Sequence, residues 1–233
     1  MSPPALSHAV LGDILEAELA VVAEGFDGLG PEDWRTRTTL RPPEAGKKPW
    51  TLVELAGHLD ISIGITLMLI DEAVAGDPPP ERNAVDFFVF PSPEVASEFY
   101  EYACTSVEGR SPAELPGMLR STFAETIAAV RRTEPAMVGA FPGFEPYPLI
   151  RLDDFVSSRI VEAVVHGIDL TDALMRPSTA TPAGVAHTAQ LLDALLLRSS
   201  RGGRPSDLDD DTAWVRAASG RTAHSDPRLP LLT

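Results

Sequence analysis

The feature that most constrains the fold is a segment in which polar side chains recur at helical spacing within an otherwise apolar run. The segment covers residues 153–174, and its apolar positions include Val156, Ile160, Val161, Ala163, Val164, Val165 and Ile168. Because steps of three and four residues return to one face of an α-helix, the segment predicts a helix with one narrow polar stripe. The residues on this stripe are Phe155, Arg159, Glu162, His166 and Asp169.

The spacing of the stripe leaves two interpretations open. Glu162 and His166 are four positions apart, so they lie one turn apart on the same face and can hold one metal ion if a third ligand comes from elsewhere. A narrow polar stripe on an apolar helix is, however, more often its solvent face, with Arg159–Glu162 and Glu162–His166 as ordinary surface pairs. The rest of the chain has to decide between the two.

The charge of the chain argues against polyanionic partners. Among 233 residues, 34 are acidic and 19 are Lys or Arg, for a formal net charge of -15. Such a surface repels phosphate backbones and anionic lipid headgroups, so we expect neither a nucleic acid nor a membrane partner.

Cysteine content and hydropathy favour a cytoplasmic location. Cys104 is the only cysteine, so no internal disulfide can form. The N-terminus lacks the basic region and apolar run of a signal peptide. The most apolar stretch, residues 61–70, is too short to span a bilayer and is expected in a core.

The remaining periodic segments predict an all-α fold. Apolar residues recur at helical spacing in residues 5–24, 51–75, 111–133 and 153–174, and Pro-rich or Gly-rich stretches separate these segments. Further helices are expected at 94–107, 183–198 and about 207–218, the last one opening with an acidic run, and no segment alternates like a strand. We therefore predict a four-helix bundle over residues 1–176, with residues 177–233 as a short helical C-terminal extension packed on it.

The second predicted helix carries an inward-facing histidine. Thr51 is a good N-cap and Glu54 completes a capping box, which sets the start of the helix. His58 then shares a face with Ser62 and with apolar residues. His58 is therefore either a metal ligand or a core imidazole whose hydrogen bonds are satisfied by a backbone carbonyl or by Ser62.

Residues 83–102 combine Pro-rich sequence with several aromatic side chains, which either line a pocket or pack locally. The only thiol, Cys104, follows this segment. No neighbouring His or basic residue in the sequence would depress its pKa, so we expect a buried structural role rather than a nucleophile.

Two segments resemble motifs of one family. Residues 50–59 (WTLVELAGHL) resemble the W-[ST]-V-x-[DE]-[LV]-x-x-H-[LI] segment of maleylpyruvate isomerase-like proteins, and residues 159–170 (RIVEAVVHGIDL) resemble their R-x-x-E-x-x-x-H-G-x-D-[LA] motif. Residues 31–38 and, more weakly, residues 219–232 are also similar to stretches of that group. These proteins belong to the DinB-like superfamily of metal-dependent, mycothiol-dependent enzymes. The resemblance covers most of residues 5–175.

The resemblance implies a DinB-like bundle, a metal site and a thiol cosubstrate. Transferred position by position, the metal, usually zinc, is held by His58, Glu162 and His166. Arg159 and Asp169, together with Ser62, become candidates for supporting these ligands or contacting the substrate. The thiol would be mycothiol, and the substrate a small molecule. Some members carry a larger α/β domain after the bundle, whereas the residues after Pro177 here allow only a short helical extension.

Two His and one Glu leave one coordination position open, as in catalytic sites. A thiol bound there is deprotonated and becomes a strong nucleophile. Adding it to an electron-poor double bond, rotating the resulting single bond and expelling it again gives cis–trans isomerisation. Retaining the adduct gives S-transfer. The alternatives are a hydrolase that uses metal-bound water and a non-catalytic bundle that binds a small molecule.

The sequence leaves the substrate and the oligomeric state open. Four arginines could receive an acidic group, although each is individually more typical of a surface side chain; they are Arg82, Arg151, Arg216 and Arg221.

Overall fold

A computed structural model describes residues 6–40, 46–76, 78–89, 93–140, 148–199 and 202–232, with the side chains of 93–96 left out. Its helices are α1 (His8–Asp27), the 3-10 turn η1 (Asp33–Arg35), α2 (Leu52–Asp71), α3 (Ala84–Phe87), α4 (Pro93–Val107), α5 (Leu115–Arg132), α6 (Leu152–Ala173), α7 (Pro182–Ser199) and α8 (Asp211–Ala218). Two strands, β1 (Val138–Ala140) and β2 (Leu149–Arg151), lie between α5 and α6.

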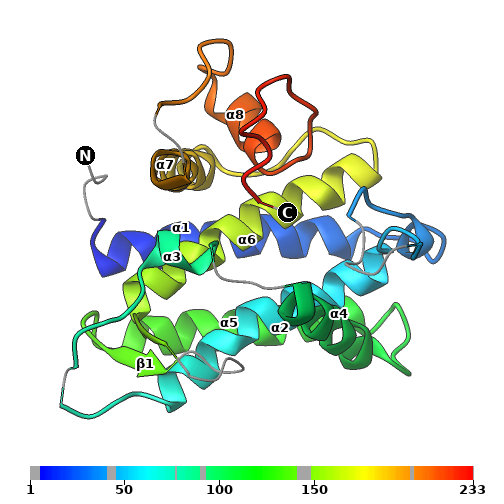
Figure 1. The fold of residues 1–233 in the computed structure, drawn as a ribbon. Coiled ribbons are helices and arrows are strands. Elements are labelled where there is room, and N and C mark those ends of the chain that lie inside the picture. Colours follow the sequence, from blue (N-terminus) through cyan, green and yellow to red (C-terminus); the bar gives the residue numbers. More distant parts are fainter. Residues whose placement is uncertain are drawn as a thin grey trace.

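Four helices form the bundle, because α1 and α2 each pack against both α5 and α6. Helix α4 packs on α2, while α7 packs on α6 and α1, and α8 packs on α7 (Figure 1). The predicted all-α architecture is therefore confirmed. Helix α6 runs through the middle of the molecule, with α2 and α5 on one side and α7 and α8 on the other. The domain boundary at residue 176 stays a prediction.

The segment between α5 and α6 was predicted as a loop without strands, and this is wrong for part of it. Strands β1 and β2 pair antiparallel, with Val138 opposite Arg151 and Ala140 opposite Leu149. Three residues are too few to show the alternation that identifies a strand in a sequence. Within that segment, residues 141–147 lie outside the described residues.

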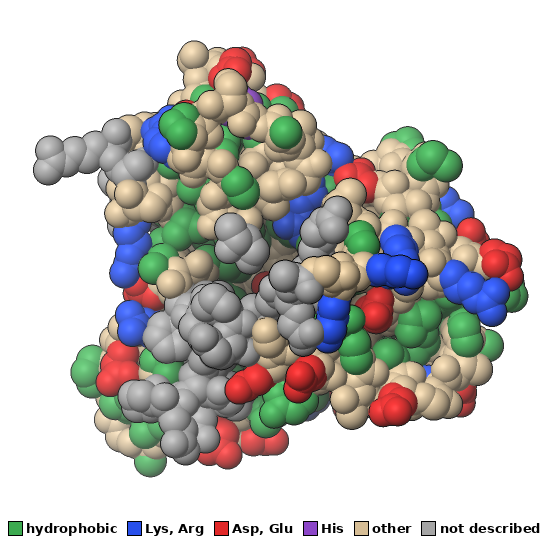
Figure 2. Space-filling model, turned by 45° about the vertical axis from the view of Figure 1, so that its right-hand side comes forward, with side chains coloured by type: hydrophobic (Ala, Val, Ile, Leu, Met, Phe, Trp, Pro, Cys, Tyr) green, Lys and Arg blue, Asp and Glu red, His purple; other side chains and the backbone are tan. Residues whose placement is uncertain are grey.

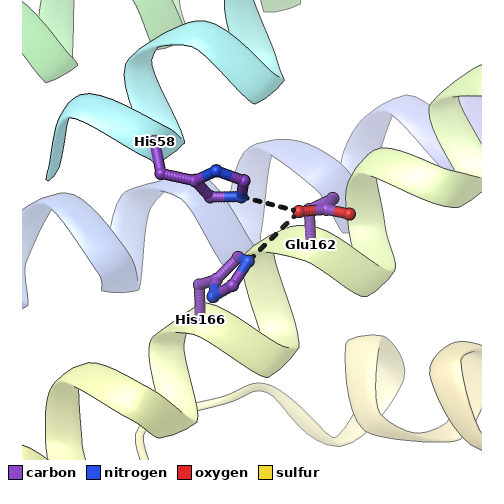
Figure 3. A group of neighbouring side chains, drawn as sticks. All are labelled: His58, Glu162 and His166. Carbon is purple, nitrogen blue, oxygen red and sulfur yellow. Dashed lines mark hydrogen bonds and ion pairs between the residues drawn. The ribbon is translucent and has the colours of Figure 1, made fainter. Parts of the chain in front are cut away.

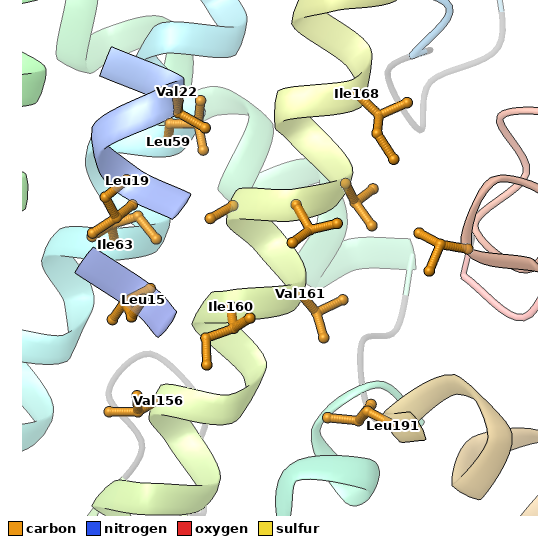
Figure 4. Packing of buried hydrophobic residues seen from close by; sticks show 14 of the residues in the cluster. Leu15, Leu19, Val22, Leu59, Ile63, Val156, Ile160, Val161, Ile168 and Leu191 are labelled. Atoms are coloured by element: carbon orange, nitrogen blue, oxygen red, sulfur yellow. The ribbon is translucent and has the colours of Figure 1, made fainter. Parts of the chain in front are cut away.

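Burial of α6 rules out the solvent-face interpretation of its polar stripe. Packing on both sides is visible in Figure 4, where Ile160 lies toward Leu15 of α1 and Val161 toward Leu191 of α7. Within the stripe, Arg159 is 2% exposed and Asp169 is 1% exposed. The stripe therefore faces the interior, and its polar groups must find partners there.

The capping box predicted at the start of the second helix is confirmed. The Thr51 side chain accepts a hydrogen bond from the backbone N–H of Glu54, and the Thr51 N–H donates to Glu54 Oε2 at 2.5 Å. Helix α2 has the length and composition of a membrane-crossing helix, and the mean hydropathy of its most apolar 18-residue stretch is 1.6. Half of that stretch is buried inside the protein. Its packing against α4, α5 and α6 accounts for its apolar surface.

Charges on the described surface are mixed. On the face in Figure 2, Lys and Arg side chains stand in separate groups among acidic side chains, and hydrophobic side chains are dispersed between them. Such a surface is compatible with the acidic balance of the sequence.

A glycine controls how closely α4 approaches α2. A Cβ atom on Gly57 would overlap the backbone carbonyl oxygen of Ala103 in α4, whereas a Cβ atom on Gly12 in α1 would meet nothing within 4 Å. We expect Gly57→Ala to lower the free energy of unfolding by about 1–3 kcal/mol, because the two backbones must separate. Gly12→Ala, the matched control, should be neutral or stabilising by up to about 1 kcal/mol. Denaturant unfolding measures both, and equal effects would contradict this account.

His8 makes the stability of the bundle depend on pH. Its Nδ1 lies 2.5 Å from Asp153 Oδ1 on α6, and its Nε2 lies 2.8 Å from the carbonyl oxygen of Val130 on α5. Both partners are hydrogen-bond acceptors, which favours a hydrogen on each ring nitrogen and hence the charged form of the ring. Burial by itself lowers the pKa of His8, but the hydrogen bonds to Asp153 and to the Val130 carbonyl, together with the negative charges of Asp153 and Glu134, raise it.

Because the folded-state pKa is raised, the pair stabilises the fold fully below pH 6.5, and the contribution is lost as pH rises through the folded pKa. We expect His8→Ala to cost about 1 kcal/mol of unfolding free energy at pH 6 and less at pH 8.5. Asp153→Asn should show the same trend. Denaturant melts across this range measure the difference, and a pH-independent loss would argue against the ion pair.

Candidate metal centre

Three side chains from two helices, α2 and α6, point toward one another (Figure 3). His58 Nε2 and His166 Nε2 each lie 3.2 Å from Glu162 Oε2, and the potential ligand atoms of all three residues lie within 4.8 Å of one another. The two imidazole rings stand nearly perpendicular, with centroids 4.5 Å apart. The structure thus brings together the three residues predicted as metal ligands.

Local sequence explains why these side chains meet. The capping box at Thr51 fixes where α2 begins, and this determines the face on which His58 lies. Glu162 and His166 are one turn apart on α6. The side chains of His58, Glu162 and His166 are 11–17% exposed, so the three residues are largely buried but remain partly accessible to solvent.

The environment favours an ionised carboxylate between the imidazoles. Burial by itself raises the pKa of Glu162, but hydrogen bonds from His166 and His58 and the positive charge of Arg159 bring it well below its ordinary value. Burial and the charge of His166 lower the pKa of His58, which favours its neutral form. A carboxylate and a neutral imidazole are the protonation states that a divalent metal requires of these ligands.

The other nitrogen of His166 has a carboxylate partner. His166 Nδ1 lies 2.9 Å from Asp169 Oδ2. Although burial works against the charged ring, the hydrogen bonds with Asp169 and Glu162 raise the pKa of His166. Burial also works against ionised Asp169, but hydrogen bonds from His166 and Arg221 lower the pKa of this carboxyl. A carboxylate at Nδ1 fixes the ring so that Nε2 faces the centre of the cluster, where it would bind a metal after losing its hydrogen.

Arg159 and Ser62 lie beside the cluster but make different contacts from those of the ligands. Arg159 Nη1 donates to the backbone carbonyl oxygen of Ser62 at 2.6 Å, and its guanidinium lies over the rings of Phe87 and Phe155, 4.7 Å from each centroid. Arg159 makes no hydrogen bond to Glu162 in the described structure and acts on it through charge. Arg159 Nη2 and Ser62 Oγ are buried without a partner among the described residues.

An aromatic pair next to His58 was missed by the sequence analysis. The Trp50 ring stands edge-on to His58 with a centroid separation of 5.1 Å, and Tyr100 of α4 packs against Trp50 at 5.3 Å. The Tyr100 hydroxyl donates to Glu54 Oε1 at 3.2 Å, so the capping box also anchors α4. Trp50 directly precedes the N-cap of α2. This position was the signal in the sequence that could have indicated that Trp50 packs near the start of the helix. Within residues 83–102, Phe90 lies outside the described residues.

Cys104 lacks the features of an activated nucleophile. It is partly buried on α4, and burial raises its pKa despite the hydrogen bond with Tyr100. Thiol reactivity requires the thiolate, so a raised pKa disfavours it.

The fold is shared with a known enzyme. A crystal structure described as the mycothiol-dependent maleylpyruvate isomerase, in a histidine-to-alanine variant, superposes with a TM-score of 0.55 and 16% sequence identity. The match covers 82% of this chain and 70% of the other. At this identity the likeness establishes the fold alone. No model of a protein family matches the sequence, and no curated protein matches it.

The donor set predicts metal binding that depends on each ligand. We expect purified protein to hold about one divalent metal per chain. His58→Ala should weaken the affinity more than about 100-fold, because loss of a ligand exceeds the roughly 10–100-fold effect of an outer partner. Elemental analysis and competition with a chelating dye measure this. His187→Ala, a histidine of α7 outside the cluster, is the control, and equal losses in both variants would contradict the assignment.

Proposed function

We propose that this chain is a metal-dependent enzyme of the same general kind as its structural neighbour, acting on a small molecule with the help of an external thiol. One observation carries the proposal: His58, Glu162 and His166 meet within 4.8 Å inside a fold that the neighbour shares. The motifs around these residues, which resemble those of maleylpyruvate isomerase-like proteins, support a distant relationship.

The residues present fit a divalent metal. Two imidazoles and one carboxylate, partly open to solvent, match the three-ligand sets of catalytic zinc sites, and zinc is therefore the metal we expect. When bound, such a metal supplies a Lewis acid with an open position that lowers the pKa of a thiol or a water molecule.

The chain's own residues prepare this site in three ways. Glu162 is kept ionised by its hydrogen bonds and by the charge of Arg159. Asp169 holds the His166 ring through Nδ1. Trp50 packs against His58 and limits the rotation of its ring. Because the positions are set before any ligand arrives, little reorganisation is needed on binding.

The nucleophile is proposed to come from outside the chain. Cys104, the only cysteine, has a raised pKa and is partly buried, which makes it unsuited to attack. The neighbour's description names mycothiol, and we infer the same cosubstrate here. Addition of that thiol to an electron-poor double bond, bond rotation and expulsion of the thiol give cis–trans isomerisation, while retention of the thioether gives S-transfer.

The partners proposed for the chain follow from its charge and its site. A small electrophile and a low-molecular-weight thiol are the proposed partners, because the three side chains of the cluster are largely buried. The acidic balance of the chain disfavours nucleic acid and anionic membranes. A cytoplasmic location fits a chain with a single cysteine and an external thiol cosubstrate.

Turnover should require both metal and thiol. We expect zinc-loaded protein to isomerise maleylpyruvate only when mycothiol is present, or to accelerate the addition of mycothiol to an electron-poor alkene. Activity should fall at least about 100-fold in His58→Ala and persist in His187→Ala. Absorbance assays with and without thiol measure this. Turnover that is unaffected by mycothiol would instead favour a hydrolase that uses metal-bound water.

A further inference from the structure

We propose that Arg221, in the segment after α8, is a positioning residue that holds His166 through Asp169 and thereby makes metal affinity depend on the C-terminal extension. The inference rests on the proposed metal site. It assigns a role to a residue that lies outside both sequence motifs of the bundle.

Three residues form a continuous chain of hydrogen bonds. Arg221 Nε donates to Asp169 Oδ1 at 2.9 Å, and Arg221 Nη2 donates to Asp169 Oδ2 at 2.6 Å. Asp169 Oδ2 is also the atom 2.9 Å from His166 Nδ1. The Asp169 side chain is fully buried and that of Arg221 is nearly so, so solvent competes little with these bonds.

The backbone explains why Arg221 reaches this place. Helix α8 ends in a Schellman motif, in which the Gly220 N–H donates to Ala217 O and the Arg221 N–H donates to Arg216 O. Gly220 has a φ of 76°, a left-handed conformation that glycine adopts without strain. This turn reverses the chain and directs Arg221 onto α6. Arg221 Nη1 also donates to the carbonyl oxygen of Ser219 at 2.5 Å.

The forked geometry matters for the imidazole. A guanidinium that grips both carboxylate oxygens fixes the plane of Asp169, which a single-point contact cannot do. The fixed carboxylate then holds the hydrogen on His166 Nδ1 and orients the ring, so that Nε2 faces His58 and Glu162. Loss of the fork should leave Asp169 and the ring free to rotate.

A simpler account is that Arg221 only docks the extension. The chain contains a matched pair that separates the two ideas. Arg216 of α8 also makes a bidentate contact, through Nη1 and Nη2, with Asp172 of α6 at 3.1 and 2.6 Å, and so docks the same extension on the same helix at a more exposed position. Asp172 has no contact with His58, Glu162 or His166 in the described structure. Docking alone therefore predicts similar effects for both pairs, and positioning predicts an effect for Arg221 alone.

The test compares Arg221→Gln, Arg221→Lys and Arg216→Gln in the full chain. The first readout is Zn²⁺ affinity by dye competition. We expect Arg221→Gln to weaken it about 10–100-fold, Arg221→Lys to weaken it less, and Arg216→Gln to change it less than about 3-fold. The second readout, in metal-free protein, is the ¹⁵N signal of the His166 ring, assigned by its disappearance in His166→Ala. Arg221→Gln should shift the Nδ1 signal, and Arg216→Gln should not.

Equal losses of affinity in Arg221→Gln and Arg216→Gln, or no loss in either, would overturn the proposal. If Arg221→Gln does not fold, Arg221→Lys decides, because lysine keeps the charge but not the fork, and unchanged affinity there also overturns it. If the wild-type chain binds no metal, the proposed function fails. The ring signal then still shows whether Arg221 orients His166.

Discussion

The structure depends on the burial of an ionised carboxylate, that of Glu162, in the middle of a helix that is covered on both sides. A buried charge is expensive unless it is met by donors and opposite charge. Here two imidazoles and a nearby guanidinium meet it. One of these imidazoles comes from α2, so α2 and α6 must pack at one register for the cost to be offset. The packing of α2 on α6 and the geometry of the site therefore depend on each other.

Much of the bundle could be predicted because its signals are local. The period of apolar residues, the capping box at Thr51 and the Pro-rich connections identify the helices within a few residues of their observed ends. Periodicity also shows which residues share a face. It cannot show what that face meets, and for this reason the stripe on α6 was compatible with solvent or with a ligand. The decision comes from α2, whose His58 meets Glu162 and His166 of the stripe, while α7 packs on α6 and helps to cover it.

The rest of the site could not be predicted because its contacts join residues that no period connects. Arg221 and Asp169 are 52 positions apart. The glycine at position 220 was a visible signal for a left-handed turn after a short helix, and such a turn sets the direction of the next residue. It does not reveal what lies in that direction. Trp50 is similar, because its place before an N-cap says nothing about His58 until the helix is built. Neither residue belongs to the proposed set of metal ligands, which is why ligand spacing does not detect them.

Helix α6 serves two sides of the molecule at once. Glu162 and His166 meet His58 of α2, while Asp169, less than one turn beyond His166, receives Arg221 from the C-terminal segment. A ligand that binds only the arrangement with an oriented His166 must stabilise the docking of that segment, and by thermodynamic reciprocity docking must tighten the ligand by the same factor. The extension is therefore coupled to the proposed centre even though it contributes none of the three ligand side chains.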